Sequence, residues 1–594
     1  MAARRPTLQS AMERFVEQAE ASSAIALERL TQVPRNAVLA LTLLVLALHL
    51  PGLLLLPPLD RTEVIYAQTA KQIIESGNAT SPSFQTEPKF EKPLPVLWLQ
   101  AATARVTGAV DQIRGYRIPS LIGTWLAVLF TYLGARHILN PRIAVIGAGL
   151  LATMLVVTVQ ATLAMPEAMM LAATCAAMLA MARIYAADDG AEPMFGTALA
   201  FWIALGAGML VNVLTVPLIA ALTAAALVAW DRGRAGWLLR LRPLAGIPLM
   251  LAIAAMWPLA LWLGGTLDAA IVQWKNEGWH LLLGPQEMKW RVALGLFIVF
   301  LLLGLFPAGL LLAPAAVTAW RERASRPVRF LIAWGLPYLV FLEVLTRKTP
   351  LYMVQAMLPP MALLFAIWIV RGAESGAHEK RWFRLGTYGW LALVAGLVAA
   401  LWALPFLLKQ MVSPVAIGLG VAVLAAAVFT TSAMLSGRRL GAALGLVVLG
   451  VAFNNLTVPV TFAGLKPVWV ASEVRAAVDT LKACKPGDVR IAGFKEPSAV
   501  FELGTDALTR EEGVVYTAWS ATEFEAWQQL TDATRIGAPG AVACVAAYDF
   551  IHACSHRFTI WARGTPAEFA RCPLPARYRC ENVPKAPMVG RMCK

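Results

Sequence analysis

Charged residues are scarce in this chain: Asp, Glu, Lys and Arg make up 15% of its 594 residues, whereas 58% are hydrophobic. The mean hydropathy of +0.63 lies far above that of soluble domains. This composition excludes an ordinary soluble globular protein and predicts a polytopic membrane protein. The net charge of +15 does not indicate nucleic-acid binding, because Lys and Arg fall mainly in short loops between apolar runs, which is the positive-inside pattern.

The chain also lacks common catalytic motifs, since no Walker motif, G-x-S-x-G or H-E-x-x-H occurs in it. Cysteine is nearly absent from the first 460 residues, where only Cys175 occurs, inside an apolar run, and we interpret it as a core residue. The other six cysteines fall in the last ~130 residues, which favours disulfides in an oxidising compartment over reduced thiols in a cytosolic domain. They are Cys484, Cys544, Cys554, Cys572, Cys580 and Cys593.

Apolar runs of spanning length recur along residues 37–464 and predict about thirteen transmembrane helices. The expected spans are 37–57, 118–138, 142–162, 164–186, 195–212, 214–230, 244–264, 293–318, 329–346, 352–371, 386–408, 412–436 and 440–460. Residues 1–36 are polar and predict a cytoplasmic tail with an amphipathic helix lying on the membrane.

The positive-inside rule orients these spans with the N-terminus in the cytoplasm. It puts two large loops, 59–117 and 266–291, on the outer side together with residues 465–594. Those last residues alternate short apolar strands (DVRIAGF, GVVYTA, GAVACVAAYDF) with helical patterns (SEVRAAVDTLKAC, ATEFEAWQQL). They predict a small periplasmic α/β domain that contains disulfides.

The first loop opens with a pair of carboxylates, Asp60 and Glu63, directly after the first span. On a helix, positions three apart share a face, so both groups can converge on one substrate and act as a general base. The alternative is an interfacial helix cap with solvated charges.

Three further places combine charge with apolar surroundings. Glu91 and Lys92 precede PVLWLQ, where the Lys can bind a phosphate, or the pair can form a surface salt bridge. Glu167, in LAMPEAMMLAA, is a carboxylate at the mouth of an apolar helix, and either serves function or is solvated. Arg347, Lys348 and Tyr352 lie on the side where positive charge is disfavoured, which indicates an anionic ligand, contact with acidic headgroups or pairing with first-loop carboxylates.

Several stretches together resemble the bacterial dolichyl-phosphate-mannose-protein mannosyltransferase-like glycosyltransferases. They are LDRTEVIYAQTAKQIIESG, FEKPLPVLWLQA, GYRIPSLIG, FWIALGAGML, RKTPLYMVQAMLPPMALL and GFKEPSAVFELGT. The resemblance implies a GT-C fold and a polyprenyl-phosphate-linked sugar as donor. It also implies that Lys92, Lys348 and Arg347 hold the lipid phosphate.

The chain departs from this family's pattern at two places. Thr62 stands where many relatives have an Asp taken as the catalytic base, and a Thr hydroxyl is not a base at neutral pH. Either Asp60 or Glu63 then takes over, or the activity is lost or altered. Asn212-Val213 replaces the family's usual Lys-Gly, which removes a cation, and Glu167 replaces an acid that is usually Asp.

We therefore expect a bacterial inner-membrane glycosyltransferase that transfers a sugar to a periplasmic lipid of lipid A type, a glycan or a protein. A non-catalytic relative that binds polyprenyl lipid or organises a partner enzyme is the alternative, and a transporter is the third. We assign no metal ligand and no cofactor beyond the donor, and we leave open whether a divalent metal is needed.

Overall fold

The structure is a computed structural model of the whole chain. It describes residues 8–59, 61–90, 93–187, 194–277, 293–345, 351–372, 377–482, 489–492, 496–505, 519–523, 540–549, 554–562, 574–583 and 591–592.

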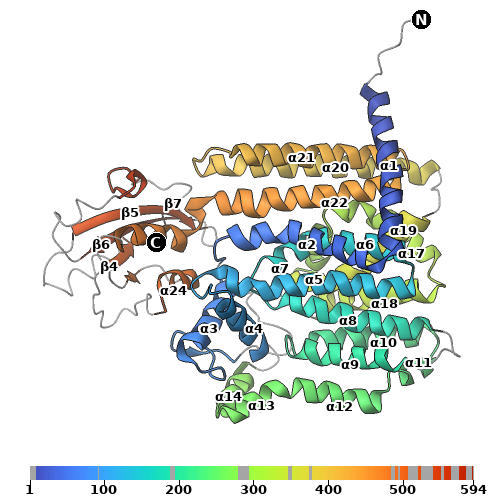
Figure 1. Cartoon of the computed structure of the whole chain (residues 1–594), viewed down its shortest axis with the longest axis horizontal. Helices are drawn as coiled ribbons and strands as arrows, with labels where there is room; N and C mark the ends of the chain where they lie inside the picture. The colour runs from blue at the N-terminus through green and yellow to red at the C-terminus, as the bar shows by residue number, and fades with distance from the viewer. Residues whose placement is uncertain are drawn as a thin grey trace, which may run out of the picture.

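Apolar helices running side by side form most of the molecule (Figure 1). Within the described residues, nine helices are long and apolar enough to cross a membrane, and two bent pairs can each form a further span. Two shorter apolar helices, α9 (Phe195–Met209) and α10 (Thr215–Trp230), run beside them. Each of the thirteen expected spans matches one of these, so the expected mostly helical membrane fold is confirmed. The nine are α2 (Pro34–Leu55), α5 (Ile113–Ile138), α8 (Glu167–Ala186), α12 with α13 (Pro243–Ala254, Met256–Leu263), α18 (Arg326–Leu345), η2 with α19 (Leu351–Met357, Leu358–Arg371), α20 (Ala377–Leu407), α21 (Pro414–Leu435) and α22 with η3 (Arg439–Asn455, Leu456–Phe462).

The two bent pairs meet at their breaks. One pair is α6 (Pro141–Thr153) with α7 (Leu155–Ala161), bent by 65°; the other is α16 (Leu296–Gly304) with η1 (Ala308–Leu311) and α17 (Leu312–Arg321), bent by 108°. The Leu155 N–H, freed by the first break, donates to the Phe306 carbonyl at the second, at 2.9 Å. Each interruption thus supplies a hydrogen-bond partner for the other, which a break at membrane depth requires.

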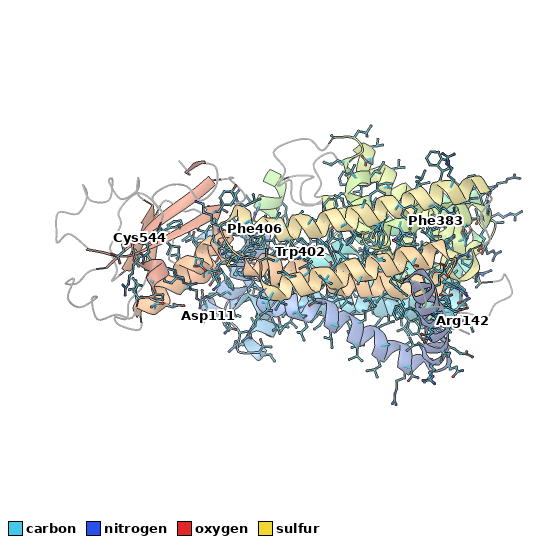
Figure 2. The ribbon with its side chains drawn as sticks, turned by 90° about the horizontal axis from the view of Figure 1, so that it is seen from above. Asp111, Arg142, Phe383, Trp402, Phe406 and Cys544 are labelled. Carbon is cyan, nitrogen blue, oxygen red and sulfur yellow. A yellow bond between two sulfur atoms is a disulfide. The ribbon has the colours of Figure 1, made fainter. Side chains whose placement is uncertain are left out.

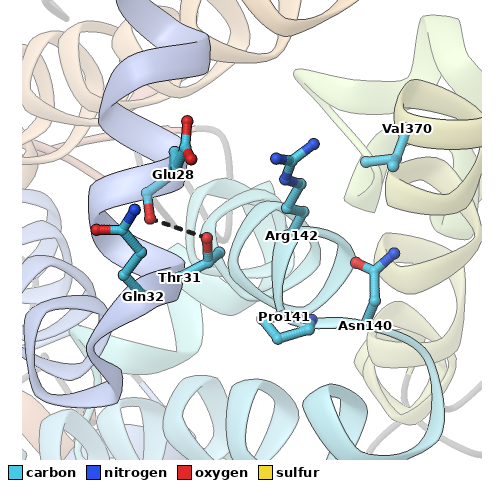
Figure 3. A pocket seen from close by; sticks show the side chains of 7 residues that line it. All are labelled: Glu28, Thr31, Gln32, Asn140, Pro141, Arg142 and Val370. Atoms are coloured by element: carbon cyan, nitrogen blue, oxygen red, sulfur yellow. Dashed lines mark hydrogen bonds between the residues drawn. The ribbon is translucent and has the colours of Figure 1, made fainter.

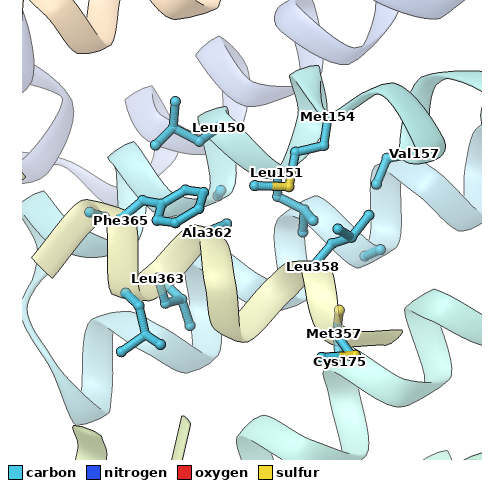
Figure 4. Close-up of a cluster of buried hydrophobic side chains, with 14 of the residues drawn as sticks. Leu150, Leu151, Met154, Val157, Cys175, Met357, Leu358, Ala362, Leu363 and Phe365 are labelled. Carbon is cyan, nitrogen blue, oxygen red and sulfur yellow. The ribbon is translucent and has the colours of Figure 1, made fainter. Parts of the chain in front are cut away.

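The core lies around η2 and α19, where 89% of the spanning window is buried. Because α19 is apolar all round, it needs neighbours on every side. Figure 4 shows Leu358, Ala362 and Phe365 against side chains of α6, α7 and α8. Cys175 is fully buried in this cluster, so its interpretation as a core residue is confirmed.

Helix α1 (Leu8–Gln32) runs across the bundle helices at one end (Figure 1). The Glu20 carboxylate accepts from the first backbone N–H groups of α22, and Glu17 pairs with Arg438 at 3.0 Å. Phe15 contacts Phe429 edge-on. The expected helix therefore exists, but it packs against other helices of the protein rather than simply lying on lipid. The Glu20 carboxylate at this contact compensates the positive N-terminus of α22. The short helix α11 (Gly236–Leu239) lies at the same end of the bundle (Figure 1).

The opposite end carries the two large loops and the C-terminal strands (Figure 1). The loop elements are α3 (Thr62–Ser76), β1 (Ser83–Phe84), β2 (Glu87–Pro88), α4 (Leu94–Val106) and α14 (Leu267–Glu277). Gly77 ends α3 in the left-handed conformation, at φ 69°. Figure 2 shows the two ends, with Asp111 and Cys544 toward one and Arg142 toward the other.

A mixed sheet with strand order β3-β4-β6-β5 forms the C-terminal part, and β7 pairs with β6. Helix α23 covers it through a cluster that includes Val478, Val545 and Phe558. The first three residues of ATEFEAWQQL, 521–523, belong to strand β4, where Ala521 pairs with Ile560, and the other seven lie outside the described residues. The stretch GVVYTA lies outside the described residues. The elements are η4 (Lys466–Val468), α23 (Val470–Lys482), β3 (Val489–Ala492), α24 (Pro497–Leu503), β4 (Trp519–Glu523), β5 (Gly540–Asp549), β6 (Cys554–Ala562), η5 (Ala576–Tyr578) and β7 (Arg591–Met592).

One expected disulfide is present, Cys544–Cys580, which ties β5 to the residues after η5. Cys484, Cys572 and Cys593 lie outside the described residues.

Candidate functional site

The turn between α7 and α8, residues 162–166, collects polar side chains from three elements that precede it. The Gln100 amide donates to the Ala164 carbonyl at 3.0 Å, and the Ser120 hydroxyl donates to the Met165 carbonyl at 2.9 Å. Both side chains are fully buried. Backbone groups of a buried turn need such partners, because no water replaces them. The turn is therefore fixed by α4 and α5 through specific hydrogen bonds.

Glu63 supplies the third contact to this turn and is itself almost fully buried. Its Oε1 accepts from the Ala164 N–H at 2.8 Å and from Arg117 Nε at 2.6 Å. Its Oε2 accepts from Arg117 Nη2 at 2.8 Å and from the Leu59 N–H at 2.9 Å. Arg117 also donates to the Leu56 and Pro57 carbonyls. Such charge-assisted, bidentate contacts hold a carboxylate in place.

These contacts favour a structural role for Glu63 over the role of a general base. A base needs a lone pair within reach of a substrate proton, whereas four donors already occupy this carboxylate. Asp60, the other candidate of the first loop, lies outside the described residues. Its neighbours are fixed on both sides: the Leu59 N–H by Glu63, and the Arg61 guanidinium by Glu496, at 2.8 and 2.9 Å.

Glu167 and Tyr352 both lie next to the same turn. Glu167 is the first residue of α8 and is buried, and its carbonyl accepts from the amide of Gln355 at 2.9 Å. Tyr352 is half-buried and packs against a small cluster that contains Leu163 and Met165. The structure thus brings η2, which follows RKTP, to the turn that holds Glu167. Arg347 and Lys348 themselves lie outside the described residues.

Glu91 and Lys92 also lie outside the described residues, but the chain before them is anchored. The Phe90 N–H donates to Gln273 at 3.0 Å, and the Trp274 indole donates to the Phe90 carbonyl at 2.8 Å. Both partners belong to α14, so the two large loops predicted for the outer side meet here.

Asn212 has a local role. Its Oδ1 accepts from the Thr215 N–H at 3.2 Å and from the Thr215 hydroxyl at 2.8 Å, and Thr215 is the first residue of α10. In this chain the position that departs from the family pattern therefore serves a helix N-terminus.

Lys71 and Asp111 form a charged pair on the outward side of α3. Lys71 Nζ lies 2.7 Å from Asp111 Oδ1 although the Lys side chain is only 7% exposed. The hydrogen bond from Lys71 holds the pKa of the Asp111 carboxyl below its usual value.

No group of three or more His, Cys, Asp or Glu side chains that could hold a metal ion occurs within the ranges that the structure describes. A pocket lined by Glu28, Asn140, Arg142 and others opens at the opposite end of the bundle (Figure 3). It shares no residue with the turn and is a separate feature.

Sequence reasoning missed Arg117, Gln100, Gln355 and Glu496. A signal for Gln100 and Gln355 exists, because each is a polar residue inside an apolar run.

Comparison with known proteins gives one matching family model, "Dolichyl-phosphate-mannose-protein mannosyltransferase", over residues 91–262. Similar curated proteins include the undecaprenyl phosphate-alpha-4-amino-4-deoxy-L-arabinose arabinosyl transferase 1 of Pseudomonas fluorescens Pf0-1, 27% identical over 57% of this chain and 58% of its own. The corresponding transferase of Pseudomonas aeruginosa UCBPP-PA14 is 29% identical over 55% of this chain and 59% of its own. The match thus spans less than two thirds of either relative.

Two solved structures share the fold over nearly the whole chain. ArnT from Cupriavidus metallidurans bound to undecaprenyl phosphate superposes with a TM-score of 0.62 at 15% identity, covering 89% of this chain and 98% of that one. The apo state of the same protein gives 0.63 at 14% identity, covering 88% and 96%. The chain is therefore a multi-pass membrane protein of GT-C fold, related to the bacterial dolichyl-phosphate-mannose-protein mannosyltransferase-like glycosyltransferases.

Proposed function

We propose that the chain transfers a sugar from a polyprenyl-phosphate-linked donor to a lipid A-like acceptor. The observation that supports this most strongly is the convergence of the first loop, the 162–166 turn and η2 at one end of the bundle, because every residue that the sequence singled out for chemistry lies in these elements or within a few positions of them along the chain. Curated relatives by sequence are named for undecaprenyl phosphate, and the solved ArnT structure of similar fold is bound to undecaprenyl phosphate.

In the proposed reaction, Asp60 takes the proton from an acceptor hydroxyl as its oxygen attacks the anomeric carbon of the donor sugar. A new glycosidic C–O bond forms while the bond between that carbon and the phosphate oxygen breaks, and the polyprenyl phosphate leaves with the electron pair. Lys92, Arg347 and Lys348 stabilise the departing phosphate. Glu167 orients the sugar or the acceptor, and Tyr352 and Glu91 complete the phosphate subsite. Glu63 supports the fold of the first loop and does not act as the base.

We further propose that the loop end of the bundle faces the periplasm and that the N-terminus is cytoplasmic in the bacterial inner membrane. The disulfide at the loop end and the Arg-rich loops at the other end support this orientation. The domain division that we propose is a tail to residue 36, a transmembrane domain to residue 464 and a periplasmic α/β domain after it.

Thr62, at the family's base position, is the observation that favours the alternative of a catalytically degenerate, lipid-binding relative. A direct test uses purified protein with undecaprenyl-phosphate-linked 4-amino-4-deoxy-L-arabinose and lipid A. Mass spectrometry follows free undecaprenyl phosphate and glycosylated lipid A. The proposal expects both products with the natural chain and neither with Asp60→Asn. A chain that is stabilised by added undecaprenyl phosphate but forms no product with this donor or with other polyprenyl-phosphate sugars is the degenerate relative.

A further inference from the structure

One stretch of the C-terminal part, Glu496–Thr505, packs on the first loop rather than only on its own sheet. Its short helix α24 contacts α3, and Phe501 is 1% exposed inside a cluster made mostly of first-loop residues. The Phe501 ring meets the Tyr116 ring edge-on, with centroids 5.7 Å apart, and the Lys71 ammonium lies 5.4 Å from its centre. The hydrophobic cluster of the first loop thus includes a residue that comes about 400 positions later in the chain.

Polar contacts follow one face of α3 from its start to its end. Arg61, Gln68 and Glu75 are seven residues apart, which is close to two helical turns, so they share a stripe. All three meet the Glu496–Thr505 stretch.

At the start of this stripe, Arg61 donates two hydrogen bonds to the Glu496 carboxylate, at 2.9 and 2.8 Å. At its end, the Gln68 amide donates to the Thr505 hydroxyl at 2.9 Å, and that hydroxyl donates to Glu75 at 2.8 Å. The Gln85 side chain adds a bond to the Thr505 carbonyl at 3.0 Å. Helix α3 is therefore held from outside along its whole length.

The other side of α3 is fixed to the membrane bundle by the buried Glu63–Arg117 pair. The residue between these two anchors is Asp60, since Glu63 holds the Leu59 N–H and Glu496 holds the Arg61 guanidinium. A reacting group needs such support, because a displacement of about 1 Å can cost about 100-fold in rate.

We propose that Glu496 is a positioning residue: through Arg61 it holds the start of α3, and with it Asp60, so that the C-terminal part completes the active site of the transmembrane part. The effect on Asp60 rests on the proposed function, whereas the holding of α3 by Glu496 does not. The side chain of Glu496 is 8% exposed and that of Arg61 is 51% exposed, so the carboxylate is the preformed partner and the guanidinium is the group it captures.

The experiment compares the full chain with Glu496→Gln, which keeps the size of the side chain but removes its charge. The matched control is Arg438→Gln, which breaks a charged pair of similar length, 3.0 Å, at the other end of the bundle. Hydrogen–deuterium exchange reports on α3, and product formation with the donor and acceptor named above reports kcat and KM.

We expect exchange in α3 to rise about tenfold in Glu496→Gln, because a charge-assisted contact is lost, with α5 unchanged. We expect kcat to fall about 10- to 100-fold with the KM of the donor within about twofold, because binding groups elsewhere stay in place. Arg438→Gln changes none of these. Unchanged α3 exchange in Glu496→Gln overturns the inference, as does a rise confined to the C-terminal sheet.

The exchange measurement separates this inference from the proposed function. If the natural chain forms no product but α3 exchange still rises in Glu496→Gln, the proposed transfer fails and the positioning of α3 stands. Should Glu496→Gln not fold, Thr505→Val replaces it: this variant loses the hydroxyl at the far end of the stripe. It should raise exchange in the last turns of α3, and unchanged exchange there overturns the inference.

Discussion

Replacing Glu63 by Ala should act mainly on stability: it should lower the free energy of unfolding by destabilising the first loop. The Glu63 carboxylate accepts four hydrogen bonds, two of them from Arg117, and both side chains are essentially fully buried. In Glu63→Ala the Arg117 charge stays buried without its counter-ion, and the Ala164 N–H loses its partner.

The magnitude follows from that burial. Breaking a buried ion pair by removing one partner costs about 3–5 kcal/mol, because the remaining charge is desolvated and uncompensated. The matched control is Glu87→Ala in the same loop, whose partner Lys89 lies 3.8 Å away and whose side chain is 66% exposed. That change should alter the free energy of unfolding by at most about 0.5 kcal/mol.

The assay is reversible unfolding of the purified protein in mixed micelles, with thermal melts followed by size-exclusion chromatography as a second measurement. A double variant, Glu63→Ala with Arg117→Met, should be less destabilised than the sum of the two single variants, because each single variant leaves an unpaired buried charge and the double variant leaves none. The reasoning is refuted if Glu63→Ala unfolds like Glu87→Ala and loses only turnover, since Glu63 would then act in chemistry and not in support.

Three further outcomes are expected. Gly123→Ala should cost about 1–3 kcal/mol, seen as a lower melting temperature, because its new Cβ would lie 2.7 Å from a backbone nitrogen of α8. The hydrogen bond from Lys71 lowers the pKa of the Asp111 carboxyl, so the stability that this carboxylate contributes is present above the ordinary value of 3.8 and is lost as pH falls through the lowered pKa. The melting temperature of the natural chain should therefore drop relative to that of Asp111→Asn as pH falls below about 4. Changing Cys544 and Cys580 together to Ser should destabilise the C-terminal sheet by about 3–4 kcal/mol, measured by its proteolysis, because the bridge closes a loop of 36 residues.

The membrane bundle was predictable from the sequence because a spanning helix needs only a long apolar run. Even the two broken spans were located, although their bends of 65° and 108° were not. Those bends depend on contact between Leu155 and Phe306, which no local pattern encodes.

The candidate site was predicted in its parts but not in its connections. Glu63 was selected as an acid near the membrane, yet its role depends on Arg117, 54 residues away, and on Ala164, 101 residues away. The same holds for Arg61, whose partner Glu496 is 435 residues distant. Single-residue patterns indicate which side chains are unusual, whereas tertiary contacts decide what those side chains do.

Strand β4 shows the same dependence on tertiary contacts at one end of a predicted helix. The pattern of ATEFEAWQQL favours a helix, but its first residues, Ala521 and Thr522, pair with β6 and belong to a strand, while its last seven residues lie outside the described ranges. Tertiary pairing overrides weak local propensity at such places.

The most direct test of the proposed transfer is made in cells. Lipids and polysaccharides are compared by mass spectrometry from cells without this protein, cells with the natural chain, cells with Asp60→Asn and cells with Arg438→Gln. The account predicts a sugar-sized mass on an envelope lipid that is present with the natural chain and with Arg438→Gln, and absent in the other two. Identical spectra in all four, with the protein present in the membrane of the last three, would contradict it.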